Sequence, residues 1–145
     1  MKKTIIFIFM SSAILYGCTP KNSMNGAWKV VSFENKSGDK VKMKLNDNMT
    51  GDELKIWSKD HYMYVGRYKM DTTNFDNYGS GTYTVAGNHY VEMPIIASRN
   101  KNAKIDQIRI LLDRKNDTIV QTWPADEKWN VDKNNYYIQK LVPAD

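Results

Sequence analysis

Side chains that could act in catalysis or hold a metal ion are few in this sequence. It contains one cysteine, Cys18, and two histidines, His61 and His89. They form neither a Cys/His zinc motif nor a His-x-x-x-His pair, and each histidine begins a predicted strand beside a turn, where we expect it to be solvated. Ser80 lies in GSG, but without the strand–Gly-x-Ser-x-Gly–helix context of a nucleophile elbow. The sequence therefore predicts no metal, no cofactor and no catalytic residue, and we expect that the protein is not an enzyme.

Tyrosine is the residue with binding chemistry that recurs at regular spacing. In HYMYVGRYKM, residues 61–70, Tyr62, Tyr64 and Tyr68 share one face of a strand and Met63 lies on the other. If the tyrosine face points inward, it forms part of an amphipathic pocket, because each ring offers apolar area and each hydroxyl a hydrogen bond. The candidate ligand-binding residues are Tyr62, Tyr64, Tyr83, Tyr90, Glu92, Gln121 and Trp123. The same choice of face, with Trp28 as the inward residue of the first strand, places further side chains inside, namely Val30, Ser32, Val85, Ile108, Ile110, Leu112 and Ile119.

Two alternatives remain open for these side chains. The tyrosines are equally expected in a filled core or on a strand face turned to solvent, since aromatic residues are common in strands. An inward Glu92 carboxylate is costly unless it is paired. If Met93 and Ile95 form the inward face of that strand instead, Glu92 is solvated.

The elements that must position these residues are strands. Alternation of apolar and polar residues, interrupted by Gly, Asn and Asp, predicts strands joined by turns. The eight predicted strands cover residues 26–33, 52–58, 61–70, 82–86, 89–97, 104–113, 117–123 and 135–142. Residues 71–81 are rich in turn formers and predict a loop. Residues 39–49 fit a strand through Val41, Met43 and Leu45 and also fit a helix, so this segment is expected to be a lid or a crossing segment.

The predicted strands favour one architecture. No long amphipathic helix separates them, so parallel crossovers are not expected. Eight antiparallel strands in sequence order most simply form an up-and-down barrel, which has no open edges. The expected fold class is therefore all-β, an eight-stranded antiparallel up-and-down barrel, with a β-sandwich as the alternative. The interior of a barrel with eight strands is either filled by side chains or holds one small ligand.

The segment before Cys18 has the layout of a secretory signal. Met1-Lys2-Lys3 is basic, and residues 4–16 are uncharged but shorter than the about 20 apolar residues of a membrane-spanning helix. Leu15-Tyr16-Gly17-Cys18 resembles the lipobox of bacterial lipoproteins. The resemblance implies cleavage after Gly17 and attachment of lipid, with acyl chains such as palmitate, to Cys18. The alternative is an ordinary secretory signal with Cys18 as a stray thiol, and a single cysteine excludes an intrachain disulfide.

Cleavage would leave 128 of the 145 residues (145 − 17), enough for one domain with a hydrophobic core. The net charge would fall from +5 to +3 because Lys2 and Lys3 leave with the signal. Acidic and basic residues are interspersed, so no basic stripe for nucleic acid is present. The expected organisation is a lipoprotein signal peptide over residues 1–17, a lipidated tether over residues 18–25, and one barrel domain over residues 26–145.

A family resemblance agrees with this organisation. NGAWKVVSF resembles the opening of lipocalin and fatty-acid-binding-protein barrels, which implies that Gly26 and Trp28 close the base of the barrel and that Lys140 is the basic residue packed over Trp28. GAWKVVS, HYMYVGRY, GSGTYTVAGNHYVE and YYIQKL, in this order, are together similar to the lipocalin-like domain of small exported lipoproteins of gut-type Gram-negative bacteria. That family has no settled activity, so the resemblance implies a lipocalin-like fold and leaves the function open.

Three functions are compatible with these features. The first is a binding protein, held at the membrane by lipid on Cys18, for a small amphipathic molecule such as a fatty acid, a bile-type steroid or a pigment derived from haem. The second is a filled barrel that binds an envelope protein or a glycan through its outer face. The third is an enzyme using Tyr and Glu92, which lacks a visible nucleophile–base pair. By resemblance to other lipoproteins, we expect a monomer on the periplasmic side of the outer membrane of a bacterial envelope.

Overall fold

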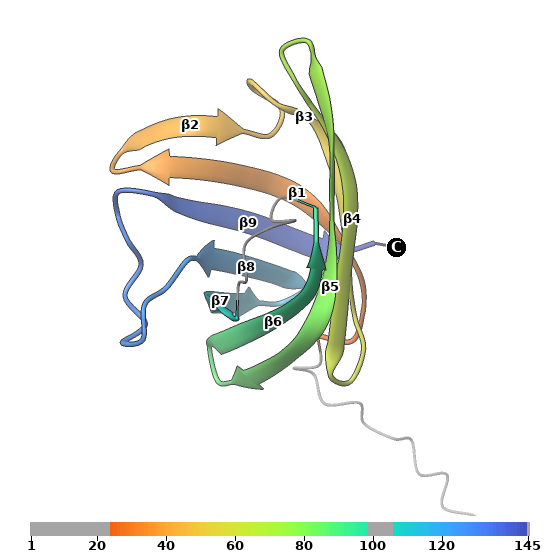
Figure 1. The fold of residues 1–145 in the computed structure, drawn as a ribbon, viewed down its shortest axis with the longest axis vertical. Helices are drawn as coiled ribbons and strands as arrows, with labels where there is room; N and C mark the ends of the chain where they lie inside the picture. The colour runs from red at the N-terminus through yellow and green to blue at the C-terminus, as the bar shows by residue number, and fades with distance from the viewer. Residues whose placement is uncertain (1–23, 99–105, 145) are drawn as a thin grey trace, which may run out of the picture.

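The computed structural model describes residues 24–98 and 106–144, which form an all-β domain without a helix (Figure 1). Every pairing between its strands is antiparallel. The strands are β1 (Gly26–Ser37), β2 (Lys40–Lys44), β3 (Thr50–Trp57), β4 (His61–Met70), β5 (Thr73–Ala86), β6 (His89–Ala97), β7 (Ile108–Lys115), β8 (Thr118–Trp123) and β9 (Tyr136–Pro143).

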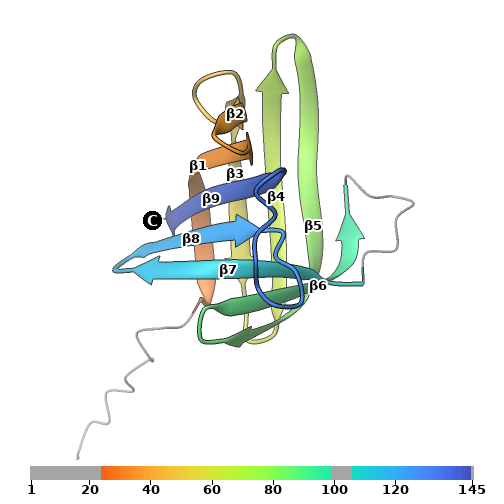
Figure 2. The same cartoon turned by 90° about the vertical axis from the view of Figure 1, so that its left-hand side faces the viewer.

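Eight of these strands close into a barrel. In the sheet, β1 pairs with β3, and from β3 to β9 each strand pairs with the next one in the sequence. Pairing of β1 with β9 closes the barrel (Figures 1 and 2). The ninth strand, β2, pairs only with the end of β1, from Glu34 to Ser37. The predicted eight-stranded antiparallel barrel is therefore confirmed, and the sandwich alternative is wrong. The ambiguous segment 39–49 is strand β2 followed by a turn, from which Leu45 and Met49 point into the core.

The predicted loop over residues 71–81 is wrong, because β5 begins at Thr73 and continues to Ala86. It pairs with β4 over its first ten residues, so β4 and β5 form a long hairpin that extends beyond the neighbouring strands (Figure 2). Asn77 and Gly79 lie on the face of β5 that points inward. Because that face carries polar and small residues, the sequence shows no apolar alternation there.

A β-bulge at Val31 changes which residues of β1 point inward. Val30 pairs with Leu141 and Ser32 with Lys140, so Val31 is an extra residue without an opposite partner. A bulge of this kind shifts the inward face by one residue. Val30 is buried, but the inward face then continues at Phe33 instead of Ser32, so the prediction of an inward Ser32 was wrong. Val85 lies opposite the buried Tyr90 and so on the predicted inward face, but it is 38% exposed because it lies near the end of β5.

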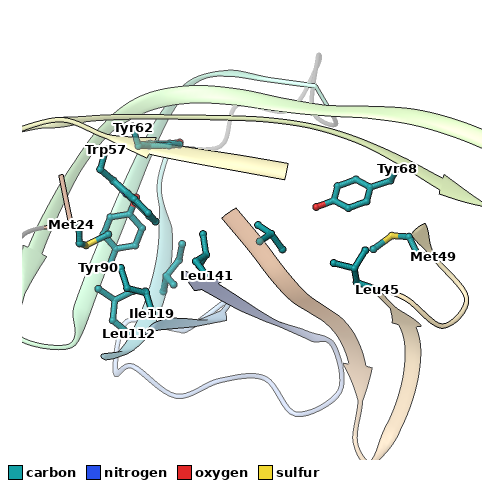
Figure 3. Close-up of a cluster of buried hydrophobic side chains, with 12 residues drawn as sticks. Met24, Leu45, Met49, Trp57, Tyr62, Tyr68, Tyr90, Leu112, Ile119 and Leu141 are labelled. Atoms are coloured by element: carbon teal, nitrogen blue, oxygen red, sulfur yellow. The ribbon is translucent and has the colours of Figure 1, made fainter. Parts of the chain in front are cut away.

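The buried apolar side chains form two groups at the two ends of the barrel (Figure 3). Leu45, Met49 and Tyr68 lie together at one end. The larger group at the other end includes Met24, Trp57, Tyr62, Tyr90, Leu112, Ile119 and Leu141. We call the end with the larger group the closed end of the barrel. Met24, two residues before the predicted boundary at Gly26, is only 4% exposed there and so belongs to the packed domain.

Trp28 contributes to the closed end, whereas Lys140 does not. The Trp28 ring meets the Trp57 ring edge-on at 6.2 Å between centroids, and Trp28 Nε1 donates to the Met24 carbonyl at 2.9 Å. Lys140 is exposed and lies between Gln139 and Leu141, which are buried. The prediction that Lys140 packs over Trp28 was wrong, because the alternation of β9 turns that side chain outward.

Cys18, the predicted signal peptide and the tether up to residue 23 lie outside the described residues. In the part of the chain that the structure describes, no helix has the length and apolar character needed to cross a membrane.

Candidate functional site

A cavity of about 570 Å³ lies inside the barrel between the two groups of core side chains. It falls within the size range of small-molecule sites, about 300–1,000 Å³. Its lining residues come from strands all round the barrel and are Phe33, Met49, Glu53, Lys55, Tyr62, Tyr64, Tyr68, Asn77, Glu92, Pro94, Ile95, Ile96, Ala97, Asp106, Ile108, Ile110, Gln121, Trp123, Tyr137 and Gln139. Ile95 and Ile96 are 71% and 56% exposed, so part of the wall is apolar surface that reaches solvent.

Five of the seven predicted ligand-binding residues line this cavity, and they are Tyr62, Tyr64, Glu92, Gln121 and Trp123. The other two do not. Tyr90 is fully buried in the closed end of the barrel, against Trp57. Tyr83 packs on Tyr90, and its hydroxyl donates to the Ser58 carbonyl at 2.6 Å. Both tyrosines point inward as predicted, but they pack in the closed end of the barrel and do not line the cavity.

A buried lysine is the centre of the first polar cluster of the wall. Lys55 Nζ lies 2.5 Å from Glu92 Oε1 and 3.2 Å from Gln121 Oε1. Both side chains of the ion pair are almost fully buried, at 6% and 5% exposure. Glu92 therefore occupies the inward face of β6, and Lys55 supplies the partner that a buried carboxylate requires. We refer to Lys55, Glu92 and Gln121 as the lysine cluster.

The lysine cluster is bonded to the closed end of the barrel through hydrogen bonds. Trp57 Nε1 donates to Tyr90 Oη at 2.9 Å, and Tyr90 Oη donates to Glu92 Oε1 at 2.8 Å. Burial, together with the negative charge of Glu92, raises the pKa of both Tyr62 and Tyr90 far above the ordinary value of a phenol. Both hydroxyls therefore stay protonated, and the Tyr90 hydroxyl can donate to Glu92.

Aromatic rings surround the lysine ammonium. Lys55 Nζ lies 5.2 to 5.9 Å from the ring centroids of Trp57, Tyr62, Tyr64 and Tyr90. Such distances permit cation–π attraction, which partly replaces the water that the ammonium loses on burial.

A second polar cluster surrounds Glu53, which is 4% exposed. Its carboxylate accepts hydrogen bonds from Asn77 Nδ2 at 2.5 Å, Gln139 Nε2 at 2.9 Å and Tyr68 Oη at 3.3 Å. The two amide nitrogens can only donate, so the arrangement fits a carboxylate, which only accepts. Among the described residues, no lysine, arginine or histidine lies within 4 Å of this carboxylate. We refer to these four residues as the glutamate cluster.

One hydrogen-bond donor among the lining residues has no partner in the described part of the chain. Gln121 is 1% exposed, and its Nε2 has no hydrogen-bond partner within residues 24–98 and 106–144. Its Oε1 faces the Lys55 ammonium, which fixes the amide with Nε2 directed elsewhere. A buried amide group without a partner costs about 1–3 kcal/mol, so this nitrogen lowers the stability of the domain.

Two glycines leave room for these side chains. Gly66 pairs with Glu53, and a Cβ at Gly66 would lie 2.8 Å from Glu53 Cβ. Gly79 pairs with Tyr64, and a Cβ at Gly79 would lie 2.5 Å from the Tyr64 hydroxyl oxygen. The glycines thus allow the Glu53 and Tyr64 side chains to lie close against the neighbouring strands.

Sequence reasoning missed Lys55 and, in the glutamate cluster, Glu53, Asn77 and Gln139, although it placed Tyr68 on the same strand face as Tyr62 and Tyr64. DELKIWS was predicted as a strand, and alternation through it puts Glu53 and Lys55 on the same face as Trp57. The large apolar Trp57 was the signal that this face is inward. Lysine and glutamate are almost never fully buried unless they are paired. Glu53 and Lys55 could therefore be predicted as inward residues only if their partners on other strands were already known.

The histidines and acidic residues offer no metal centre in the described part of the chain, where no three potential ligands come together. His61 is exposed, with Nδ1 2.7 Å from Asp60 Oδ1. His89 departs from the expectation of a solvated imidazole, because its ring is stacked on Trp129 at 3.8 Å between centroids and is half-buried.

The sequence was also compared with known proteins. A scan against protein-family models finds no match, and a search of curated proteins finds none either.

Proposed function

We propose that the protein is a lipid-anchored envelope lipoprotein that binds one small amphipathic molecule inside its barrel. The observation that carries the proposal is the cavity of about 570 Å³ bounded by both apolar and hydrogen-bonding side chains. Pockets for small molecules combine mostly apolar walls with a few placed polar groups. Here, rings and isoleucines supply the apolar wall, and the lysine and glutamate clusters supply the polar groups.

The cavity favours this proposal over the filled-barrel alternative. In a filled barrel the side chains would interdigitate and leave few voids larger than a water molecule. The space between Tyr62 at one end and Met49 at the other is far larger than a water molecule. Binding is also favoured over catalysis, because the two clusters hold their groups in ion pairs and hydrogen bonds without a nucleophile beside a base.

The anchor forms a separate part of the proposal and rests on the lipobox resemblance at Cys18. Several acyl chains on one residue would hold the domain stably at a membrane, since one chain alone binds only weakly. A Cys18→Ser chain should take up no acyl label and should keep its signal. Metabolic labelling with an acyl-chain analogue measures this, and equal labelling of variant and natural chain would contradict it.

Titration of an environment-sensitive apolar dye tests the binding function. The full chain carrying Cys18→Ser should bind the dye at a single saturable site. Tyr64→Ala should weaken binding by about tenfold to a hundredfold, because it removes one ring contact and one hydrogen-bonding hydroxyl. Met63→Ala is the matched control, since Met63 is the neighbouring residue of β4 and points outward, with 47% exposure.

The outcome that contradicts the proposal is equally specific. Dye binding that does not saturate, or that responds equally to both substitutions, would show that the cavity is not the binding site. The filled-barrel interaction module would then be the better description.

A further inference from the structure

The cavity wall carries a buried negative charge that the described residues do not neutralise. Lys55 and Glu92 compensate one another at 2.5 Å. Glu53 has three hydrogen-bond donors around it, but they are neutral amide and phenol groups. Among the described residues, the one further charged side chain of the wall is Asp106, which is exposed and also acidic. The described part of the wall therefore presents an excess of one buried carboxylate to a ligand.

Because the uncompensated Glu53 carboxylate is buried, its charge should influence which ligands bind. An isolated charge in a medium of low polarity is strongly disfavoured, and hydrogen bonds from neutral donors relieve only part of that cost. A carboxylate has about four lone-pair positions, of which the glutamate cluster fills three. The remaining position can accept one more hydrogen bond, and Glu53 lines the cavity from which that bond would come.

Aromatic rings lie beside the glutamate cluster. Phe33 pairs across the strands with Gln139, which donates to Glu53. The Phe33 ring lies 5.9 Å from the Tyr137 ring and 6.3 Å from the Trp123 ring, so these three residues form a continuous wall, which we call the three-ring wall. Aromatic faces attract cations, including quaternary ammonium groups, most strongly where water is excluded.

We propose that the cavity selects amphipathic ligands with a cationic head, a protonated or quaternary amine, which lies between the Glu53 carboxylate and the three-ring wall. This inference rests on the proposed binding function and specifies its ligand class.

The same charges disfavour the anionic ligands that the sequence suggested. Fatty acids, bile-type steroids and haem-derived pigments carry carboxylates. Such a head would have to approach Lys55 beside the Glu92 carboxylate, or lie in a cavity that already contains the Glu53 carboxylate. Both arrangements place like charges together in a buried space, which is unfavourable.

Matched single-chain probes test the inference on the full chain carrying Cys18→Ser. Dodecyltrimethylammonium, dodecanol and dodecanoate share one chain and differ in head charge, and each is titrated against bound dye below its micelle concentration. Dodecyltrimethylammonium has no N–H and is attracted only by the carboxylate charge and the ring faces, so it should bind about tenfold more tightly than dodecanoate. Dodecylphosphocholine presents the same ammonium as a phospholipid does. Tighter binding than dodecyltrimethylammonium would identify a lipid head as the source of the cation, and weaker binding would identify a free amine.

Substitution of the carboxylate locates the preference. Glu53→Gln should bring the affinities for the ammonium and carboxylate probes together. Asp52→Asn is the control, because Asp52 is the preceding residue of β3 and its side chain is 86% exposed. That variant should keep the natural preference.

Failure of this inference differs from failure of the binding function. Saturable binding of dodecanol with equal or tighter binding of dodecanoate would overturn the cation preference and leave the binding function standing. No saturable binding of any probe would overturn both. If Glu53→Gln does not fold, the order of the probes on the unsubstituted cavity still decides the question.

Discussion

Removal of the Lys55 charge should destabilise the barrel more than any loss of a surface ion pair. Lys55→Met keeps a side chain of similar length but leaves Glu92 buried without its cation. Breaking one partner out of a buried pair costs about 3–5 kcal/mol, mostly because the other charge stays uncompensated. Both side chains are at most 6% exposed, so water cannot replace the lost partner without opening the barrel. Glu92→Gln should cost a similar amount, since it leaves the lysine alone.

The double variant gives the decisive comparison. Lys55→Met with Glu92→Gln removes both charges, while the glutamine can still accept the Tyr90 hydrogen bond. It should therefore be no less stable than either single variant, which makes the coupling energy at least about 3 kcal/mol. The free energy of unfolding is measured by urea denaturation with circular dichroism, because substitution beside Trp57 also changes the fluorescence.

An exposed pair provides the control for this experiment. Arg67 Nε lies 2.7 Å from Asp76 Oδ1 on β4 and β5, with side chains that are 78% and 53% exposed. Arg67→Met should change the stability little, because solvent screens such pairs. Two results would contradict the expectation: Lys55→Met lowers the free energy of unfolding by less than about 1 kcal/mol, or the effects of the two single substitutions simply add. Either result would show that the Lys55–Glu92 pair is hydrated and is not the buried ion pair described above.

Three further substitutions or titrations follow from the packing. Gly79→Ala should displace the Tyr64 ring, which should weaken dye binding and lower the free energy of unfolding by about 1–3 kcal/mol. Dye titration and urea denaturation measure these two effects, and an unchanged dye affinity together with an unchanged stability would contradict the close contact. Trp28→Ala should lower the free energy of unfolding by about 3 kcal/mol, the low end of the range for a large aromatic residue, because Trp28 is only half-buried. A loss below about 0.5 kcal/mol would place Trp28 outside the core. Tyr62 and Tyr90 should not ionise in the folded protein near pH 10, so phenolate absorbance should show two tyrosines that titrate only on unfolding. Because their pKa is raised in the folded state, the stability they confer is complete below about pH 10 and is lost as the pH rises further, and full titration of all tyrosines in the folded state would contradict this.

The strand pattern was the part of the fold that the sequence could predict. Where apolar and polar residues alternate clearly, as from His61 to Met70, the strand and its inward face were both predicted correctly. Strand β5 was missed over its first half because Asn77 lines the cavity and Gly79 lies on the same face, so its inward residues do not look like a core. Alternation reports burial in an apolar core, and it is lost where the interior is polar.

The polar clusters could not be predicted, for a different reason. Lys55 and Glu92 are separated by 37 positions and lie on β3 and β6, which are not neighbours in the sheet. Their contact crosses the interior and depends on how the barrel closes. The bulge at Val31 was equally hidden, since an extra residue in a strand leaves the local composition unchanged. The side chains of the site were thus partly predictable one strand at a time, and their pairing was not.

The hydrogen bonds from Trp57 through Tyr90 to Glu92 join the lysine cluster to the closed end of the barrel, which gives the two sides of the cavity different freedom to diverge. On the lysine side, a change in ligand preference would also alter the bonds that hold the closed end together, so selection for folding constrains it. On the other side, the residues of the three-ring wall contact one another through their rings. Substitutions of Phe33 or Tyr137 would reshape the cavity without breaking a buried ion pair. New ligand specificities in a lineage of such barrels would therefore arise first along that wall, while the lysine side would be inherited unchanged.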